Sequence, residues 1–190
     1  MRITGGGLSG LTIKVPRGIR PTQDRVREAL FSILADRVRG AAFADLFAGS
    51  GAVGIDAVSR GAAKVCWVER GRGAGRLLKE NVNRLCRDTS TSLRIAAGDV
   101  FRFLQRENDL GPYDIIFADP PYALGKSGEK EKDAAALLKA VSASRVLSEN
   151  GLFIIEQAAG RSCGRAAGWE SIDKRTYGGT SLEFMRPENS

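Results

Sequence analysis

Short apolar runs and helical patterns alternate through most of the chain. Five runs have the length and the apolar content of buried strands, and the segments between them repeat apolar residues at intervals of three or four. Strands that alternate with helices at this spacing predict an α/β fold with a mostly parallel, doubly wound sheet. The five predicted strands are 41–47, Lys64–Glu69, 93–97, Tyr113–Ala118 and 151–156.

The N-terminal region adds a hairpin and a helix to this pattern. Glycines surround an alternating run over 11–15, which predicts a strand in a short β-hairpin. Pro21 can open a helix, with Thr22 placed to cap it. The apolar stripe of this helix would face the core and leave Arg25 and Arg27 toward solvent or a ligand. The expected stripe is Val26, Ala29, Leu30, Ile33 and Leu34.

Two further runs near the C-terminus, 169–176 and 181–185, flank a pair of glycines. This arrangement predicts an antiparallel hairpin that completes a seven-stranded sheet. A chain of 190 residues is long enough for one α/β domain and too short for two. The expected organisation is a single domain over 1–190, with a basic N-terminal extension over 1–40 and the catalytic core over 41–190.

The composition excludes histidine as a catalytic residue or metal ligand, and it gives the chain a net positive charge. The chain has no histidine and three widely spaced cysteines without a CxxC pair, so we expect no metal site. The cysteine usage fits a reducing cytoplasm, and no apolar stretch is long enough for a membrane span. Residues 1–40 carry eight basic and three acidic side chains, which is +5 of the net +7. A clustered basic surface favours contact with nucleic-acid phosphates, with a merely solvated face as the alternative.

A glycine-rich segment follows the first predicted core strand. Residues 49–54 (GSGAVG) satisfy G-x-G-x-x-G between a strand and a helix, where glycines let the backbone approach a ligand closely. Glu69 ends the next strand, and its carboxylate there can accept both hydroxyls of a ribose. The pattern indicates an adenosine-containing cofactor and leaves a dinucleotide and S-adenosylmethionine both open.

Two acids near this loop refine the cofactor hypothesis. Asp45 ends the first core strand, where it would suit a methionine ammonium group and repel a pyrophosphate; an ordinary strand-end carboxylate bonded to backbone is the equal alternative. Asp99 could accept the amino group of an adenine while Val100 donates its backbone N–H to the ring. The alternative for Asp99 is a helix N-cap, which does not exclude the first role.

The segment 119–122 (DPPY) ends the fourth core strand. Two prolines cannot continue a central strand, so the chain leaves the sheet at the edge where α/β proteins bind ligands. Asp119 and the Pro120 carbonyl could accept hydrogen bonds from the exocyclic amino group of a nucleobase and favour a reactive lone pair. Tyr122 could stack on the unstacked base. An ordinary turn is the alternative reading of the same four residues.

Three stretches together resemble a known family: 20–31 (RPTQDRVREALF), 45–51 (DLFAGSG) and 119–122. The chain resembles the RsmD family of bacterial 16S rRNA (guanine-N2)-methyltransferases over nearly its whole length. The resemblance implies a class I methyltransferase fold, S-adenosylmethionine as cofactor, and a guanine of 16S rRNA as target, within a small-subunit particle. We expect a cytoplasmic monomer that takes part in small-subunit biogenesis.

The site residues expected from the motifs and the resemblance fall into three groups. The catalytic group is Asp119, Pro120, Pro121 and Tyr122. The cofactor group is Asp45, Phe47, Gly49, Ser50, Gly51, Glu69, Arg70, Asp99 and Val100. The RNA group is Arg17, Arg20, Thr22, Arg25, Arg27 and, in a polar loop expected over 125–132, Lys126.

Three other functions use the same residues. An N6-adenine methyltransferase would share the DPPY motif, because Asp119 and the Pro120 carbonyl could hold the exocyclic amino group of adenine as well as that of guanine. An NAD-dependent oxidoreductase would share the glycine loop but leave the DPPY motif without a role. A non-catalytic RNA-binding assembly factor would need only the basic surface.

Overall fold

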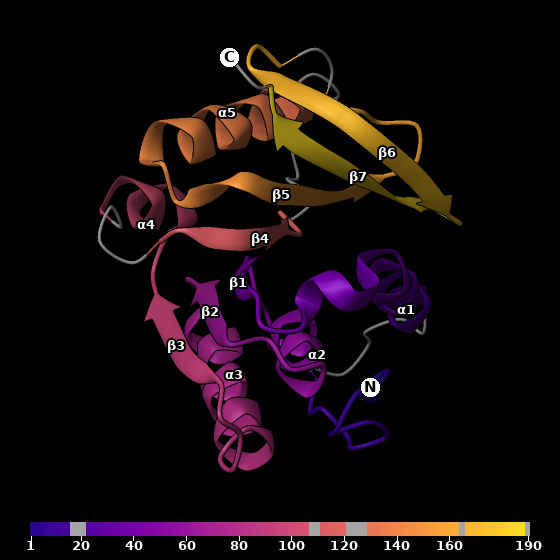
Figure 1. Ribbon diagram of the computed structural model, residues 1–190, viewed down its shortest axis with the longest axis vertical. Coiled ribbons are helices and arrows are strands. Elements are labelled where there is room, and N and C mark those ends of the chain that lie inside the picture. The colour runs from indigo at the N-terminus through magenta and orange to yellow at the C-terminus, as the bar shows by residue number, and fades with distance from the viewer. Residues whose placement is uncertain (16–21, 107–110, 121–128, 164–165, 189–190) are drawn as a thin grey trace.

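The computed structural model describes residues 1–15, 22–106, 111–120, 129–163 and 166–188, without the side chains of residues 22, 23 and 129–133. Seven strands form one continuous sheet in the order β3-β2-β1-β4-β5-β7-β6 (Figure 1). The helical elements are α1 (Thr22–Leu34), η1 (Ala35–Val38), α2 (Ala52–Ser59), α3 (Arg72–Leu85), α4 (Val100–Arg106) and α5 (Glu129–Ser144). The strands are β1 (Ala42–Leu46), β2 (Lys64–Glu69), β3 (Ser92–Ala97), β4 (Tyr113–Ala118), β5 (Leu147–Ala158), β6 (Trp169–Tyr177) and β7 (Thr180–Pro187).

The pairing of the strands confirms the predicted doubly wound sheet. Strands β1 to β5 run parallel, and β7 is antiparallel to both β5 and β6. From β1 the chain adds β2 and β3 on one side, and it then returns to place β4 and β5 on the other. The strand order therefore reverses between β1 and β4, and the crevice beyond the carboxyl ends of these two strands is where such sheets bind ligands.

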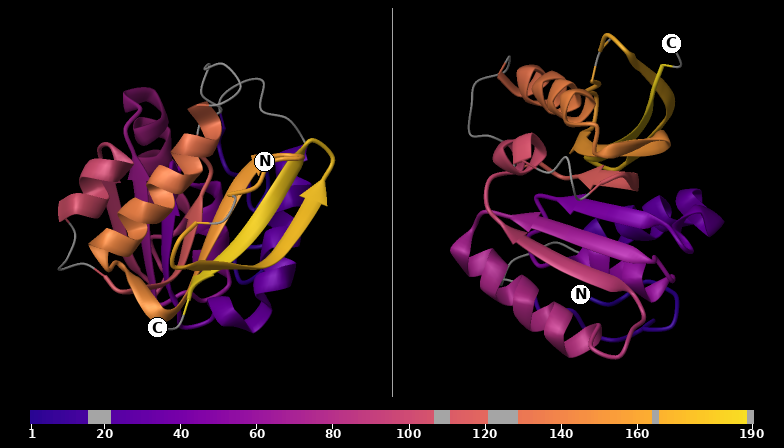
Figure 2. Two further views of the ribbon diagram at one scale, coloured as in Figure 1. Left: turned by 90° about the horizontal axis from the view of Figure 1, so that it is seen from above. Right: turned by 60° about the vertical axis from the view of Figure 1, so that its left-hand side comes forward.

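Helices cover both faces of the sheet (Figure 2). Successive side chains of a strand point to opposite faces, so each strand contributes to two apolar clusters. One cluster joins alternate strand residues such as Phe43 and Phe117 to α1, α2 and α3. The other joins the intervening residues, such as Leu46 and Ile116, to α4 and α5.

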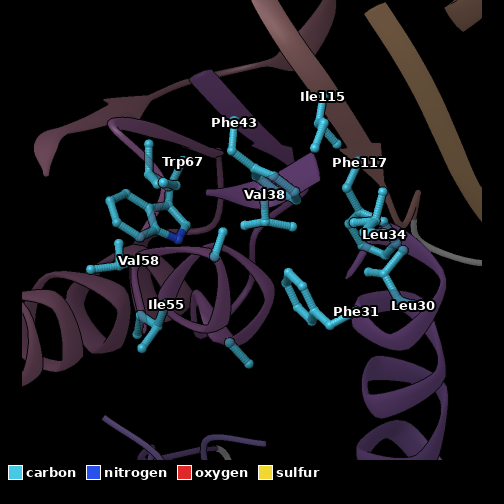
Figure 3. Close-up of a cluster of buried hydrophobic side chains, with 14 of the residues drawn as sticks. Leu30, Phe31, Leu34, Val38, Phe43, Ile55, Val58, Trp67, Ile115 and Phe117 are labelled. Atoms are coloured by element: carbon cyan, nitrogen blue, oxygen red, sulfur yellow. The ribbon is translucent and has the colours of Figure 1, made fainter. Parts of the chain in front are cut away.

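Trp67 belongs to a cluster of buried hydrophobic side chains (Figure 3). Its ring is fully buried against α2, and its Nε1 donates a hydrogen bond to the Gly51 carbonyl over 3.2 Å. A Cβ atom added at Gly54 would lie 2.1 Å from the same Nε1. Gly54 is therefore required for the close contact between α2 and β2, which keeps the loop in place.

Three expectations about the elements need correction. The N-terminal hairpin has a single bridge, between Arg2 and Thr12, because the glycine-rich segment pairs with α2 as well as with itself. Helix α5 begins at Glu129, inside the loop expected over 125–132. The buried face of α1 is Val26, Arg27, Leu30, Phe31 and Leu34, whereas Ile33 is exposed.

We expect Gly54→Ala to lower the free energy of unfolding by about 1–3 kcal/mol, because the added methyl group would displace a fully buried indole. Urea denaturation measures the change. Gly75→Ala on α3 is the matched control, since a Cβ atom there meets nothing within 4 Å. The control should gain about 0.5–1 kcal/mol from its higher helix propensity. Equal effects at both positions would contradict the proposed role of Gly54.

Candidate active site

Three acidic side chains meet at the carboxyl ends of β1, β4 and β5. Asp45 pairs in register with Phe117, and Ala118 pairs with Ile155, so Asp119 and Glu156 occupy the next position on their strands. Strand alternation puts all three on the face covered by α1 and α2. They line one cavity of about 140 Å³. Its other walls are formed by Met1 of the N-terminal segment, by α1, and by residues 47–50 of the loop.

Burial makes these carboxyl groups hard to ionise. It is the largest cause that raises the pKa of Asp45 to about 7. The backbone hydrogen bond from Gly54 lowers this pKa, and the charges of Asp119 and Glu69 raise it by smaller amounts. Burial raises the pKa of Asp119 to about 6. Glu156 is raised to a pKa of about 8, first by burial and then by the Asp119 charge. Perturbed carboxyl groups that gather in a cavity are typical of a functional site.

The glycine loop between β1 and α2 is held from several sides. Gly49 donates its backbone N–H to Oε2 of Glu69 over 2.8 Å, and Gly71 donates to Oε1 of the same carboxylate over 2.5 Å. Asn81 of α3 donates to the Ser50 carbonyl over 3.0 Å. Gly51 has φ 83°, and a Cβ atom there would lie 2.4 Å from Leu78. Glycine is therefore required at position 51, because the backbone conformation and the contact with Leu78 leave no room for a side chain.

A second cavity of about 230 Å³ lies beside the first. Phe47 and Asp119 line both cavities, so the two are neighbours across these side chains. Phe47 has φ 64°, a conformation that is strained for an aromatic residue and that places it at the boundary. The remaining walls of the second cavity are Val68, Glu69, Arg70, Gly71, Gly98 and Val100.

The structure bears on both alternatives that the sequence left for the two acids near the loop. Asp45 accepts a hydrogen bond from the Gly54 N–H over 2.9 Å, which is the backbone bond of the first alternative. Asp45 also lines the first cavity, so this bond does not exclude contact with a ligand. Asp99 is an N-cap, because its Oδ1 accepts the N–H groups of Phe101 and Arg102. Its side chain lines an adjoining cavity that shares Val68 and Gly98 with the second one.

These features fit S-adenosylmethionine. Glu69 accepts one backbone N–H at each oxygen, and each oxygen keeps a lone pair that can accept a ribose hydroxyl. The loop N–H groups and the Asp45 carboxyl group in the first cavity suit an amino-acid end with an ammonium group. Val100 is buried at the wall where an adenine would lie.

Arg27 is not on the RNA-facing surface that the sequence predicted. Its side chain is only 3% exposed, with Nε 2.5 Å from Oδ2 of Asp56 and Nη2 3.1 Å from Oδ1 of Asp24. Nη2 also donates to the Arg2 carbonyl. The prediction was wrong because the buried face of α1 is rotated by about one residue from the apolar stripe, which turns Arg27 inward.

Asp56, which the sequence analysis missed, is the centre of this network. The carboxylate is fully buried in α2 and also pairs with Arg60 at 2.6 Å. It accepts hydrogen bonds from the backbone N–H and the hydroxyl of Thr4 over 2.8 and 2.9 Å. The network thereby ties the N-terminal segment and α1 to α2, beside the first cavity.

The other predicted RNA and catalytic residues have different positions. Arg25 is exposed on α1, and Thr22 is the first residue of that helix, with its side chain outside the described part. Pro120 is half-buried next to Asp119. The predicted contacts at Arg17, Arg20, Pro121, Tyr122 and Lys126 lie outside the described residues.

Glu156 is the acid of the first cavity that the sequence analysis did not select. It ends the apolar run 151–156, just as Asp119 follows the apolar run of β4. An acid at the end of an apolar run was therefore visible in the sequence at both positions. Parallel strands bring such acids to the same edge of the sheet. Only the strand order shows that β5 lies next to β4.

Two features are absent from the described residues. No helix in this part of the chain has the length and apolar character needed to cross a membrane. Within the same residues, no group of three or more His, Cys, Asp or Glu side chains is arranged to hold a metal ion.

The sheet order, the glycine loop and the acid that ends β2 define the class I S-adenosylmethionine-dependent methyltransferase fold. The solved structure described as "Putative methyltransferase yhhF from Escherichia coli" superposes with a TM-score of 0.82 at 30% identity, covering 100% of this chain and 99% of that one. A hypothetical protein of Thermus thermophilus superposes with a TM-score of 0.79 at 34% identity over 98% and 99% of the two chains.

The sequence matches the model of the family "Conserved hypothetical protein 95" over residues 1–186, and the chain belongs to this family. It is 39% identical over 127 residues to Ribosomal RNA small subunit methyltransferase D of Escherichia coli K12, covering 66% of this chain. That alignment spans 62% of the relative's length. The protein of the same name from Haemophilus influenzae is 29% identical over 98% of this chain and 93% of its own. The resemblance to the RsmD family is thereby confirmed.

We expect Arg27→Met to lower the free energy of unfolding by about 3 kcal/mol, because it removes one cation from the fully buried Asp56. Arg25→Met, on the exposed side of the same helix, should change it by no more than about 0.5 kcal/mol. Thermal and urea unfolding of both variants measure the difference. Similar small effects would mean that Asp56 does not depend on Arg27.

Proposed function

We propose that this protein transfers a methyl group from S-adenosylmethionine to the exocyclic N2 amino group of a guanine in 16S rRNA. The observation that carries the proposal is the position of Asp119. It is a half-buried residue at the end of β4, it is followed by Pro120, and it lines both cavities beside the glycine loop. The relatives named Ribosomal RNA small subunit methyltransferase D support rRNA as the substrate class.

The residues that would hold the cofactor are those around the two cavities. Glu69 would bind the ribose hydroxyls, and Val100 and Asp99 would contact the adenine. Asp45 and the loop from Phe47 to Gly51 would hold the methionine end. When bound, S-adenosylmethionine supplies an electrophilic methyl group.

The residues at the end of β4 would prepare the amino group. The nitrogen lone pair of an exocyclic amine is delocalised into the base, so the amine is a poor nucleophile. Hydrogen bonds from its two N–H groups to the Asp119 carboxylate and the Pro120 carbonyl orient the amine and favour a pyramidal nitrogen. Fixed orientation supplies much of the rate acceleration in such transfers. Tyr122 would stack on the base.

The charge of the molecule supports an RNA partner. The exposed Arg25 belongs to the basic segment 1–40, and a second segment, 70–106, carries nine basic and three acidic side chains. Arg94, Arg102 and Arg106 of the second segment line the cavity that adjoins the adenine end. Phosphate contacts of this kind give affinity without reading sequence. We further propose a monomeric protein that acts in the cytoplasm, where ribosomal subunits assemble.

Transfer of tritiated methyl groups to RNA tests the proposal. Unmodified small-subunit particles and free 16S rRNA are incubated with the protein and labelled cofactor, and the nucleosides are then separated. We expect the label in N2-methylguanosine. Asp119→Ala should abolish transfer and leave cofactor affinity within a few-fold, because its role is to hold the amine. Label in N6-methyladenosine, or full activity of the variant, would overturn the proposal.

The pH dependence of the reaction follows from the Asp119 pKa. The carboxylate must be ionised to accept the N–H group, and burial raises its pKa to about 6. We therefore expect kcat/KM to fall about tenfold per pH unit below pH 6 and to level off between about pH 6 and 7. Cofactor binding measured over the same range is the control. A flat kcat/KM between about pH 5 and 7 would contradict an acceptor role for this carboxylate.

A further inference from the structure

Glu156 is the one acid of the first cavity to which neither the loop nor the methyl-transfer chemistry assigns a task. It lies near the carboxyl end of β5, one position beyond the residue that pairs with Ala118, and is therefore beside Asp119 across the β4–β5 pairing. Both side chains face the cavity that Phe117, Leu30 and Arg27 also line. A base whose amino group is held by Asp119 would bring its neighbouring edge atoms toward this position.

The bonding of Glu156 differs from that of other buried acids. Glu183 on β7 accepts hydrogen bonds from Gln157, Ser162, Ser171 and the Cys163 backbone, so its role is structural. Among the described residues, no hydrogen bond or ion pair holds the side chain of Glu156. A half-buried carboxyl group without a protein partner loses hydration, and its polar atoms gain a partner when a ligand fills the cavity.

We propose that Glu156 determines the specificity for guanine, by accepting the N1–H and donating to O6 of the target base while Asp119 and Pro120 hold its N2 amino group. The proposal rests on the proposed function. Along the pairing edge of guanine, the N2 amine is followed by the N1–H donor and the O6 acceptor. A carboxylic acid offers one acceptor and one donor side by side and matches these two atoms. Adenine presents an acceptor at N1, followed by a C–H group, and cannot form the same pair.

The surroundings of Glu156 favour the acid form. Burial, followed by the Asp119 charge, raises its pKa to about 8, while the pKa of Asp119 is about 6. Near pH 7 Asp119 is therefore the ionised member of the pair and Glu156 the neutral one. The other charged or titratable groups of residues that line the cavity are Asp45, the α-amino group of Met1, and Arg27, whose guanidinium is engaged by Asp56.

The test compares two bases at the target position of the RNA. 2-Aminopurine keeps the N2 amine and N3 but lacks the N1–H and O6, so it retains the reacting group and loses the proposed contacts. Wild-type protein should prefer guanine by about 10- to 100-fold in kcat/KM, the discrimination typical of a bidentate contact to a base. Glu156→Ala should lose this factor on guanine and change kcat/KM on 2-aminopurine by less than about threefold.

Glu156→Gln is the matched variant, because its amide also offers one acceptor and one donor. It should keep kcat/KM on guanine within about fivefold of wild type. Between about pH 7 and 8.5 the guanine preference should decline in wild type, as Glu156 ionises, and stay constant in Glu156→Gln. Cofactor affinity, measured by equilibrium dialysis, should be unchanged in both variants.

Three outcomes would overturn this inference: equal losses on both bases, no loss in Glu156→Ala, or a cofactor affinity reduced tenfold or more. The first would indicate a structural role, and the last a contact with the cofactor. In each case a wild-type protein that methylates guanine leaves the proposed function standing. A wild-type protein that methylates no guanine overturns the proposed function itself, and this inference with it.

Discussion

The site depends on the parallel pairing of β1 with β4, at the point where the strand order reverses. Their register places Asp45 opposite Phe117, and therefore brings the end of β1 beside Asp119. The two strands are about seventy residues apart in the chain, and the backbone hydrogen bonds between them determine which side chains share the crevice. The pairing of β4 with β5 then adds Glu156 to the same edge.

The acids of this edge oppose folding. Each carboxyl group loses hydration on burial, which raises its pKa, and the Asp119 charge raises the pKa values of Asp45 and Glu156 further. The surrounding structure compensates for only part of this cost, through the bond from Gly54 to Asp45. A cavity with negative potential suits a cationic cofactor and an amine-bearing base, so the local cost is consistent with a functional role.

Met1 of the N-terminal segment and residues of α1 form one wall of the first cavity. Their position depends on Asp56, whose carboxylate binds Arg27, Arg60 and Thr4 and so joins three separate parts of the chain. This arrangement explains why a cation within the basic N-terminal region is buried. It also separates two roles for positive charge in that region, since Arg27 supports the fold and the exposed Arg25 is available to a polyanion.

The sequence by itself determined the fold class, the five core strands and most of the site, because strand periodicity, glycine loops and strand-end acids are local patterns. Glu69, Asp119 and the loop could be recognised because each lies at the end of a strand or directly after one. The inward position of Arg27 and the position of Glu156 beside Asp119 could not be recognised in this way. The first depends on which face of α1 packs against α2, and the second on β5 lying beside β4. Both are decided by long-range packing, which the tertiary structure alone provides.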